Sequence, residues 1–142
     1  MTQIRMIKIS LVIVLMVFAP FIKAETVIVH PTLNDLHLTK TTLRAIFAMR
    51  IPQWPDGTPV NVFVLDDEHP LHMQFCKSLL GMFPYQLRRI WDQQAFSGTG
   101  VRPNRVSSEA EMRQRIANTP GAIGYISDAE IDATVTALGA PS

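Results

Sequence analysis

The sequence is poor in cysteine: it contains one thiol, Cys76, and no second one with which it could pair inside the chain. An internal disulfide is therefore excluded, and the stability of the fold must come from burial of apolar side chains. The material for a core is present, because 47% of the 142 residues are hydrophobic. Such a composition is too apolar for a disordered chain, and the length suits one domain.

The sequence also lacks a large excess of charge of either sign. The formal net charge of the whole chain is +1. Residues 1–24 carry three basic and no acidic side chains, so without them ten basic residues face twelve acidic ones, a balance of −2. Nucleic-acid binding depends mainly on a basic surface. The charge balance therefore offers no support for a nucleic-acid partner.

Long apolar runs are scarce as well, and the one that stands out extends from Ile9 to Phe18. With about ten residues it is shorter than the ~20 that a membrane-spanning helix needs. Basic residues precede the run, and Ala24 supplies the small residue that a signal peptidase requires before its cut. We interpret residues 1–24 as a secretory signal peptide, with a membrane anchor as the alternative, and expect residues 25–142 to form one domain in the periplasm.

Strand-like and helix-like segments alternate along residues 25–142. Beta-branched runs bounded by turn residues predict strands at 26–30, 60–65 and 122–126, and a further edge strand at 134–138. Apolar residues that recur every three or four positions predict helices at 39–49, 70–82 and 84–96, and Ser108 with Glu111 predicts the capped start of another. Strands separated by helices indicate the α/β class, in which ligands collect in loops beyond the carboxyl ends of strands.

Four aromatic side chains raise the question of a sugar-binding platform: Trp54, Tyr85, Trp91 and Phe96. Aromatic residues at helical spacing usually pack in a core. We therefore expect these four residues to be structural.

The loop that follows the predicted helix at 84–96 has the residue types of an anion site. Backbone amides, hydroxyls and a guanidinium can together hold an anion. The loop supplies them from Ser97, Gly98, Thr99, Gly100 and Arg102. The same glycines would serve any tight connection between two elements, so both interpretations stay open.

A second group of chemically active side chains surrounds the start of the predicted helix at 70–82. His72 and Cys76 are four residues apart, so they would face the same side, and His69 could join them as a metal ligand. The spacing matches no standard zinc motif. The alternative is a buried thiol beside solvated histidines, with acidic residues that favour the positive end of the helix dipole.

No nucleophile with a spaced base and an orienting group can be identified. Cys76 lies within a predicted helix and Ser97 in a glycine loop, and neither has such partners in the pattern. We therefore expect a protein that is not an enzyme and that uses no cofactor.

The order of several short motifs resembles one known family. They follow one another as LRAIF from Leu43, WPDG from Trp54, a helix with Phe75, then Trp91, FSGTG from Phe96 and PGAIGYI from Pro120. In this order they are similar to the phosphate-binding proteins of phosphate ABC transporters, and more closely to short single-lobe relatives, over about residues 26–126. The resemblance implies an α/β fold, a single lobe of a type II periplasmic-binding-protein-like fold with a mixed sheet flanked by helices.

The resemblance also implies where a ligand would bind. In full-length members the second lobe contributes an arginine and a Ser-Gly-Thr at a helix N-terminus, ahead of a phenylalanine that matches Phe75. Counted back from Phe75, the Ser-Gly-Thr positions fall on residues 69–71 and the arginine on about Leu65, so none of the four matches. The acidic residues 66–68 beside them would repel an anion.

In the same family, PGAIGYI is a strand that returns through the sheet. The resemblance implies that Gly124 lets a neighbouring element lie close and that Tyr125 packs against that element.

The residues and the resemblance together predict a non-catalytic, periplasmic binding module related to phosphate uptake. Its ligand would be phosphate or another small anion, and its partner the membrane component of an ABC transporter or a sensor; a homodimer is a further option. The alternative is an interaction or sensor-accessory protein that kept the fold, lost the ligand and docks to a membrane partner. The candidate anion-binding residues are His69, Leu71, His72, Ser97, Gly98, Thr99, Gly100 and Arg102.

Overall fold

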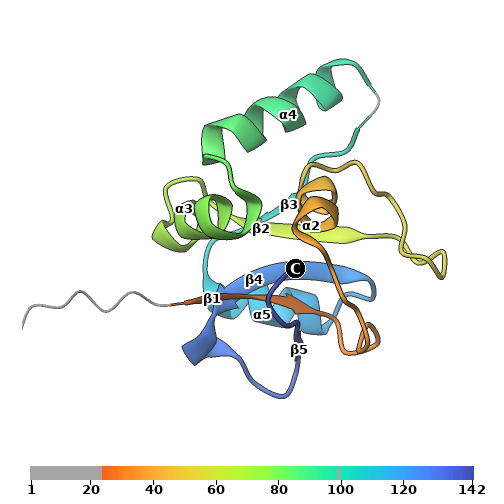
Figure 1. The fold of residues 1–142 in the computed structure, drawn as a ribbon, viewed down its shortest axis with the longest axis vertical. Coiled ribbons are helices and arrows are strands. Elements are labelled where there is room, and N and C mark those ends of the chain that lie inside the picture. The colour runs from red at the N-terminus through yellow and green to blue at the C-terminus, as the bar shows by residue number, and fades with distance from the viewer. Residues whose placement is uncertain (1–23, 99) are drawn as a thin grey trace, which may run out of the picture.

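The structure is a computed structural model that describes residues 24–98 and 100–142. Residues 1–23, almost all of the predicted signal peptide, lie outside the described residues, so that interpretation stays a prediction. The described part forms one five-stranded sheet with helices packed on both of its faces (Figure 1). Within this part, no helix is long and apolar enough to cross a membrane.

The strands are β1 (Glu25–Val29), β2 (Asn61–Leu65), β3 (Asn104–Val106), β4 (Ala122–Ser127) and β5 (Thr136–Ala137). Their order in the sheet is β3-β2-β4-β1-β5, so β4 is the central strand. β2 is parallel to β3 and to β4, whereas β1 is antiparallel to β4 and to β5. This mixed sheet confirms the predicted fold class.

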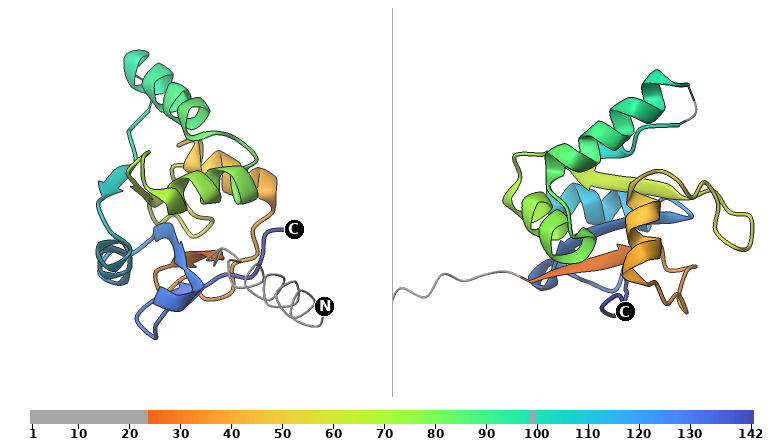
Figure 2. Two further views of the ribbon diagram at one scale, coloured as in Figure 1. Left: turned by 90° about the vertical axis from the view of Figure 1, so that its left-hand side faces the viewer. Right: turned by 45° about the horizontal axis from the view of Figure 1, so that its top comes forward.

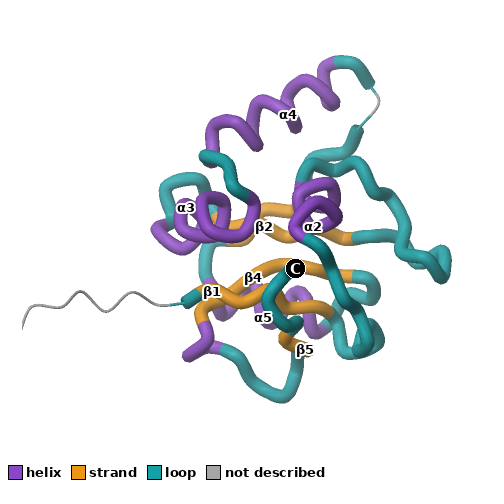
Figure 3. Tube along the Cα trace, in the orientation of Figure 1, coloured by secondary structure: helices purple, strands orange, loops and turns teal. Residues whose placement is uncertain are grey.

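The helices are α2 (Lys40–Phe47), α3 (Pro70–Phe75), α4 (Pro84–Phe96) and α5 (Glu109–Ala117), with a π-helical turn at Cys76–Leu80 and a 3₁₀ turn at Asp128–Glu130. α5 covers one face of the sheet, and α2 and α3 cover the other (Figures 1 and 3). α4 lies farther from the sheet, beyond α2 and α3 (Figure 2). The layers are those expected of an α/β domain.

Side-chain caps fix where two of the helices begin. Thr39 Oγ1 accepts a hydrogen bond of 3.0 Å from the Thr42 amide at the start of α2. Ser108 Oγ accepts one of 3.1 Å from the Glu111 amide at the start of α5. Such caps satisfy amides that have no partner within the helix. Both helices therefore begin within a residue of where the sequence predicts them.

β4 passes close to α5 at Gly124. A Cβ atom placed there would lie 2.6 Å from Ile116 Cδ1 and 2.6 Å from Met112 Sδ, closer than such atoms approach in real proteins. The missing side chain thus lets α5 lie directly against the strand. The prediction that Gly124 allows a close approach is confirmed.

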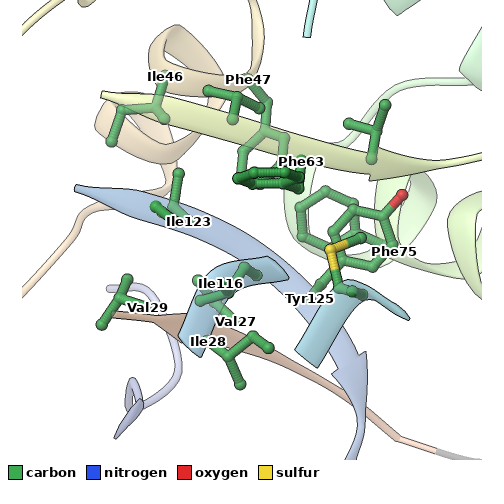
Figure 4. Close-up of a cluster of buried hydrophobic side chains, with 14 of the residues drawn as sticks. Val27, Ile28, Val29, Ile46, Phe47, Phe63, Phe75, Ile116, Ile123 and Tyr125 are labelled. Atoms are coloured by element: carbon green, nitrogen blue, oxygen red, sulfur yellow. The ribbon is translucent and has the colours of Figure 1, made fainter. Parts of the chain in front are cut away.

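Tyr125 points to the opposite face of the sheet, because side chains alternate along a strand. Its ring stacks on Phe75 with the two centroids 3.9 Å apart, and it lies 6.0 Å from the ring of Phe47 (Figure 4). The prediction that Tyr125 packs against the same element as Gly124 is therefore wrong. It packs against α2 and α3, whereas Gly124 packs against α5.

The four aromatic residues that were expected to be structural divide into two pairs. Trp54 and Trp91 are buried, with 4% and 3% of their surface exposed. Tyr85 and Phe96 are 59% and 96% exposed, so the expectation of a core position is wrong for them. Both lie on α4, which buries only one side against the rest of the molecule and leaves the other in water.

Two local features depart from the prediction. The helix expected at 70–82 is α-helical only to Phe75 and continues as a π-helical turn, after which Gly81 ends it with a φ of 65°. The sequence does not predict β3, because this strand has three residues of which two are exposed, and so it shows no apolar alternation.

Candidate functional site

The carboxyl ends of β2, β3 and β4 lie at one edge of the sheet, because these strands are parallel. Residues 66–69 follow β2 at this edge and lead into α3. Binding sites of α/β sheets form at such edges. The edge therefore holds the loop at which the family resemblance implies a ligand, together with the ends of two other strands.

His69 caps α3 with its own ring. Its Nδ1 accepts a hydrogen bond of 3.1 Å from the Leu71 amide, and its carbonyl accepts one of 3.0 Å from the His72 amide. The Leu71 side chain is buried. The backbone amides that an anion would need at this helix start are thus already hydrogen-bonded within the chain. No free backbone donor therefore supports the predicted anion-binding role of His69, Leu71 and His72.

The two aspartates of the loop pair with arginines from other elements. Asp67 Oδ2 pairs with Arg88 Nη2 of α4, and Asp66 Oδ1 lies 3.7 Å from Arg105 Nε of β3. The Asp67 side chain is 12% exposed, and that of Asp66 is 45% exposed. These carboxylates take up the cations that an incoming anion would bind.

His72 points into the core and is fully buried. Its Nδ1 is hydrogen-bonded to the Tyr125 hydroxyl, and its Nε2 lies 3.6 Å from Cys76 Sγ and 3.7 Å from Asp67 Oδ1. The expectation of a solvated histidine is therefore wrong, because α3 turns this side chain toward β4. The expectation of a buried thiol at Cys76 is confirmed.

The hydrogen bonds of Tyr125 favour one assignment of the ring nitrogens of His72. The Tyr125 oxygen accepts a hydrogen bond of 2.9 Å from the Leu65 amide, so its own hydrogen can point to His72 Nδ1. Nδ1 is then the acceptor, and Nε2 carries the ring hydrogen toward Asp67 and Cys76. One chain of hydrogen bonds thus links β2, β4 and α3.

Burial decides the protonation of this cluster. It lowers the pKa of His72 to about 4, and the positive charge of the Arg105 guanidinium acts in the same direction. Burial also raises the pKa of the Cys76 thiol to about 12 and raises the pKa of Tyr125. At neutral pH all three buried side chains are therefore uncharged. A neutral thiol is a poor nucleophile and a poor metal ligand.

The metal-site alternative finds no support in this geometry. In the part of the chain that the structure describes, no three His, Cys, Asp or Glu side chains are grouped so that they could hold a metal ion. His69 Nδ1 faces the Leu71 amide, and His72 Nδ1 faces the Tyr125 hydroxyl, so the two imidazoles are engaged separately.

Ser127 ends β4 at the same edge of the sheet. Its amide donates a hydrogen bond of 2.6 Å to Glu109 Oε1, whereas its buried hydroxyl has no hydrogen-bond partner among the described residues. The negatively charged Glu109 carboxylate therefore lies beside Ser127 and would repel an anion that approached it. The hydroxyl therefore does not extend the site toward an anion.

The glycine loop after α4 uses its own donors. The amides of Gly98 and Gly100 each donate a hydrogen bond of 3.2 Å to carbonyls in the last turn of α4. The Ser97 hydroxyl donates a hydrogen bond of 3.1 Å to the Gln94 carbonyl, which also accepts from the Gly100 amide. Thr99 lies outside the described residues. The amides of Gly98 and Gly100 that were predicted to hold an anion are thus already hydrogen-bonded within the chain.

Arg102 is also paired within the chain, and its loop lies away from α3. Its Nη1 is 2.6 Å from Asp92 Oδ1. Gly100 and Arg102 border a hollow of about 360 Å³ that no residue of α3 lines. The loop and α3 lie near opposite ends of α4 (Figures 1 and 2). The structure therefore does not bring the two predicted halves of an anion site together.

Sequence reasoning missed Arg88 and the hydrogen-bonding role of Tyr125. Arg88 stands beside Arg89 on the exposed side of α4, and nothing in the pattern distinguishes the two. A signal did exist for Tyr125, because a tyrosine within a buried strand needs a partner for its hydroxyl.

Comparison with known proteins gives two findings. The PBP superfamily domain matches residues 15–140 of this chain. Among solved structures, the ABC-type phosphate transport receptor from Vibrio cholerae is 19% identical with a TM-score of 0.63, and PstS from Borrelia burgdorferi is 19% identical with a TM-score of 0.62. No curated protein sequence matches the chain.

The two structural matches confirm the resemblance in fold. Each covers 82% of this chain but only 45% of the Vibrio protein and 46% of the Borrelia protein. This chain thus spans less than half the length of either relative. At 19% identity the likeness concerns the fold, and the chemistry of the site has to be taken from the residues themselves.

Proposed function

Because the chain belongs to the family of PBP superfamily domains, we propose that it is a non-catalytic, periplasmic interaction module. Its own carboxylates pair with the arginines that a free anion would otherwise bind. It keeps the binding-protein fold and acts by contact with a partner at the membrane. One observation carries this proposal. At the carboxyl end of β2, Asp67 pairs with Arg88 and Asp66 lies beside Arg105, while His69 caps the helix that follows.

A second candidate function is weak phosphate binding, as in the relatives described as phosphate receptors. The pair of Asp66 and Arg105 favours it. Their atoms are 3.7 Å apart and both side chains are largely exposed, at 45% and 61%. Such a loose surface pair holds together weakly, so that a free anion could compete with Asp66 for Arg105.

The melting temperature of the protein with and without millimolar phosphate separates the two functions, with sulfate as the control anion. A ligand at a hundred times its dissociation constant adds about 2.7 kcal/mol of stability, which raises the melting temperature of a domain of this size by several degrees. We expect no shift that is specific to phosphate. A shift with phosphate and none with sulfate would overturn the proposal in favour of weak phosphate binding.

A charge-neutral variant tests the reason for the expected lack of binding. The double variant Asp66→Asn, Asp67→Asn releases Arg88 and Arg105, and we expect it to gain a phosphate-dependent rise in melting temperature. The matched control is Asp92→Asn, which releases Arg102 at the other end of α4. An equal gain in the control would mean that any freed arginine on this surface attracts phosphate, and that the loop has no special role.

A further inference from the structure

A patch of exposed aromatic, methionine and basic side chains lies on the outer side of α3, the π-helical turn and the start of α4. We refer to it as the aromatic-basic patch, and it consists of Met73, Lys77, Phe83, Tyr85 and Arg89. Met73, Phe83 and Tyr85 are 43%, 46% and 59% exposed. Large apolar side chains that gather at the surface in this way mark a site of contact with another molecule.

Ring and cation contacts join Lys77, Phe83 and Tyr85 within the aromatic-basic patch. Lys77 Nζ lies 5.6 Å from the centroid of the Phe83 ring. The rings of Phe83 and Tyr85 are stacked, with centroids 5.8 Å apart and planes inclined by 13°. Arg89 follows Tyr85 by one turn on the exposed side of α4, and Lys77 borders two hollows, one beside Phe83 and one beside Met73. The patch is therefore one continuous surface.

Positive charge prevails in and around the patch. Lys77 and Arg89 are not among the ion pairs that the described residues form. Arg44 adds a third cation, because its Nε reaches the carbonyl at the end of the π-helical turn at 2.8 Å. Glu25 borders the patch on the side of α3, and Glu68 lies on the loop that precedes this helix.

The chain enters the described fold at the margin of the patch. Glu25, the first residue of β1, is hydrogen-bonded to Gln74 and Ser78, and both of these line the hollow beside Met73. The apolar run of residues 9–18 ends only a few residues earlier in the sequence. Kept as a membrane anchor, the alternative to a signal peptide, that run would leave this face of the domain beside the bilayer.

We propose that the aromatic-basic patch rests on an anionic lipid surface. Aromatic side chains flanked by Lys and Arg are the residues with which proteins settle at the boundary between a membrane and water. Unpaired cations complement the negative charge of anionic headgroups. The entry of the chain beside the patch favours a bilayer over a protein partner. This inference does not depend on whether the loop of residues 66–69 binds an anion.

Co-sedimentation with lipid vesicles tests the proposal. The full chain is expressed and the protein is used as the cell exports it, with vesicles of phosphatidylcholine alone or mixed with phosphatidylglycerol. We expect binding to the anionic vesicles, weakened by salt. Lys77→Glu should lower the partition onto them by more than about fivefold, since this is the factor that one cation contributes near such a surface.

Matched variants distinguish binding through the patch from nonspecific adsorption to vesicles. The double variant Phe83→Ser, Tyr85→Ser should remove binding. Phe96→Ser changes an exposed aromatic residue at the far end of α4, and Arg50→Glu changes an exposed cation outside the patch, so both should leave binding unchanged. Melting temperatures show that each variant is folded before its binding is compared.

Three outcomes would overturn the proposal. They are a lack of binding by the parent protein, equal binding by the patch variants, and an equal loss in the two control variants. A dimer in solution that the patch variants abolish, without vesicle binding, would identify a second copy of the chain as the occupant. The phosphate experiment can contradict the proposed function without changing any of these results, because it tests the loop of residues 66–69 and not the patch.

Discussion

Tyr125 holds three parts of the molecule together through one hydroxyl group. Its oxygen accepts a hydrogen bond from the Leu65 amide of β2 and is bonded to His72 of α3, while its ring stacks on Phe75. All of these groups are buried. A buried polar group that loses its partner costs more than the hydrogen bond itself contributes, because water cannot replace the partner.

Removal of the Tyr125 hydroxyl should therefore destabilise the protein while the ring packing stays. We expect Tyr125→Phe to lower the free energy of unfolding by about 1–3 kcal/mol, measured by urea denaturation. The matched control is Tyr85→Phe, because the Tyr85 side chain is exposed; its effect should stay within about 0.5 kcal/mol. If both variants unfolded at the same urea concentration as the parent, the hydroxyl would have no structural role.

At the scale of elements, β4 depends on two glycines for different reasons. Gly121 precedes the strand with a φ of 76°, and a Cβ atom there would lie 2.1 Å from the Pro59 carbonyl oxygen. At Gly124 the two atoms that a Cβ would approach too closely, at 2.6 Å each, are the ends of flexible side chains, Ile116 and Met112, and the Phe63 carbonyl oxygen lies at an ordinary contact distance of 3.4 Å. Side chains can move aside more easily than backbone.

Alanine at these two positions should separate the effects. Gly124→Ala should cost about 1–3 kcal/mol through overpacking. Gly121→Ala should cost more, because a strained φ adds to a clash with backbone. Gly139→Ala serves as the control, since no atom lies within 4 Å of its Cβ position. Urea denaturation gives the order, and a larger loss at Gly124 than at Gly121 would contradict this account of β4.

The elements that could be predicted are those with regular burial. α2 buries Leu43, Ile46 and Phe47 at helical spacing, and β4 is buried throughout, so local pattern and final structure agree. β3 shows no such pattern, because its place is set by pairing with β2 rather than by its own residues. Tertiary pairing of this kind leaves little trace in a single sequence.

The same limit applies to the candidate site. The sequence placed His69 and the acidic residues after β2 at a helix start, which the structure confirms. It could not show that Arg88 would come from α4 to meet Asp67, because that contact joins residues 21 positions apart. Nor could it show that His72 is buried, since a histidine in a short helix can lie on the side that packs against the core or on the side that faces solvent.

At the scale of the whole molecule, buried side chains from every layer form one core. It joins strands β1, β2, β3 and β4 to α2, α3, α4 and α5. The His72 cluster lies inside this core, with Tyr125 from β4, Cys76 from the π-helical turn, and Asp67 from the loop around it. A group that must stay neutral inside a core makes the stability of the entire domain depend on pH.

His72 sets the direction of that dependence. Its pKa is about 4 in the folded protein and 6.5 in its ordinary state, which we take for the unfolded chain. The unfolded state therefore binds the proton first as the pH falls. The stabilising contribution is fully present above pH 6.5 and is lost as the pH falls through 4, by about 3 kcal/mol in total.

Urea denaturation of the parent protein and of His72→Phe across this range tests the prediction. Carboxylates also take up protons below about pH 5, but they do so in both proteins, so that the difference between the two curves isolates His72. We expect the parent to lose stability more steeply than the variant between pH 6.5 and pH 4. Parallel curves would mean that His72 is as accessible to protons in the folded protein as in the unfolded one, which its burial between α3 and β4 does not allow.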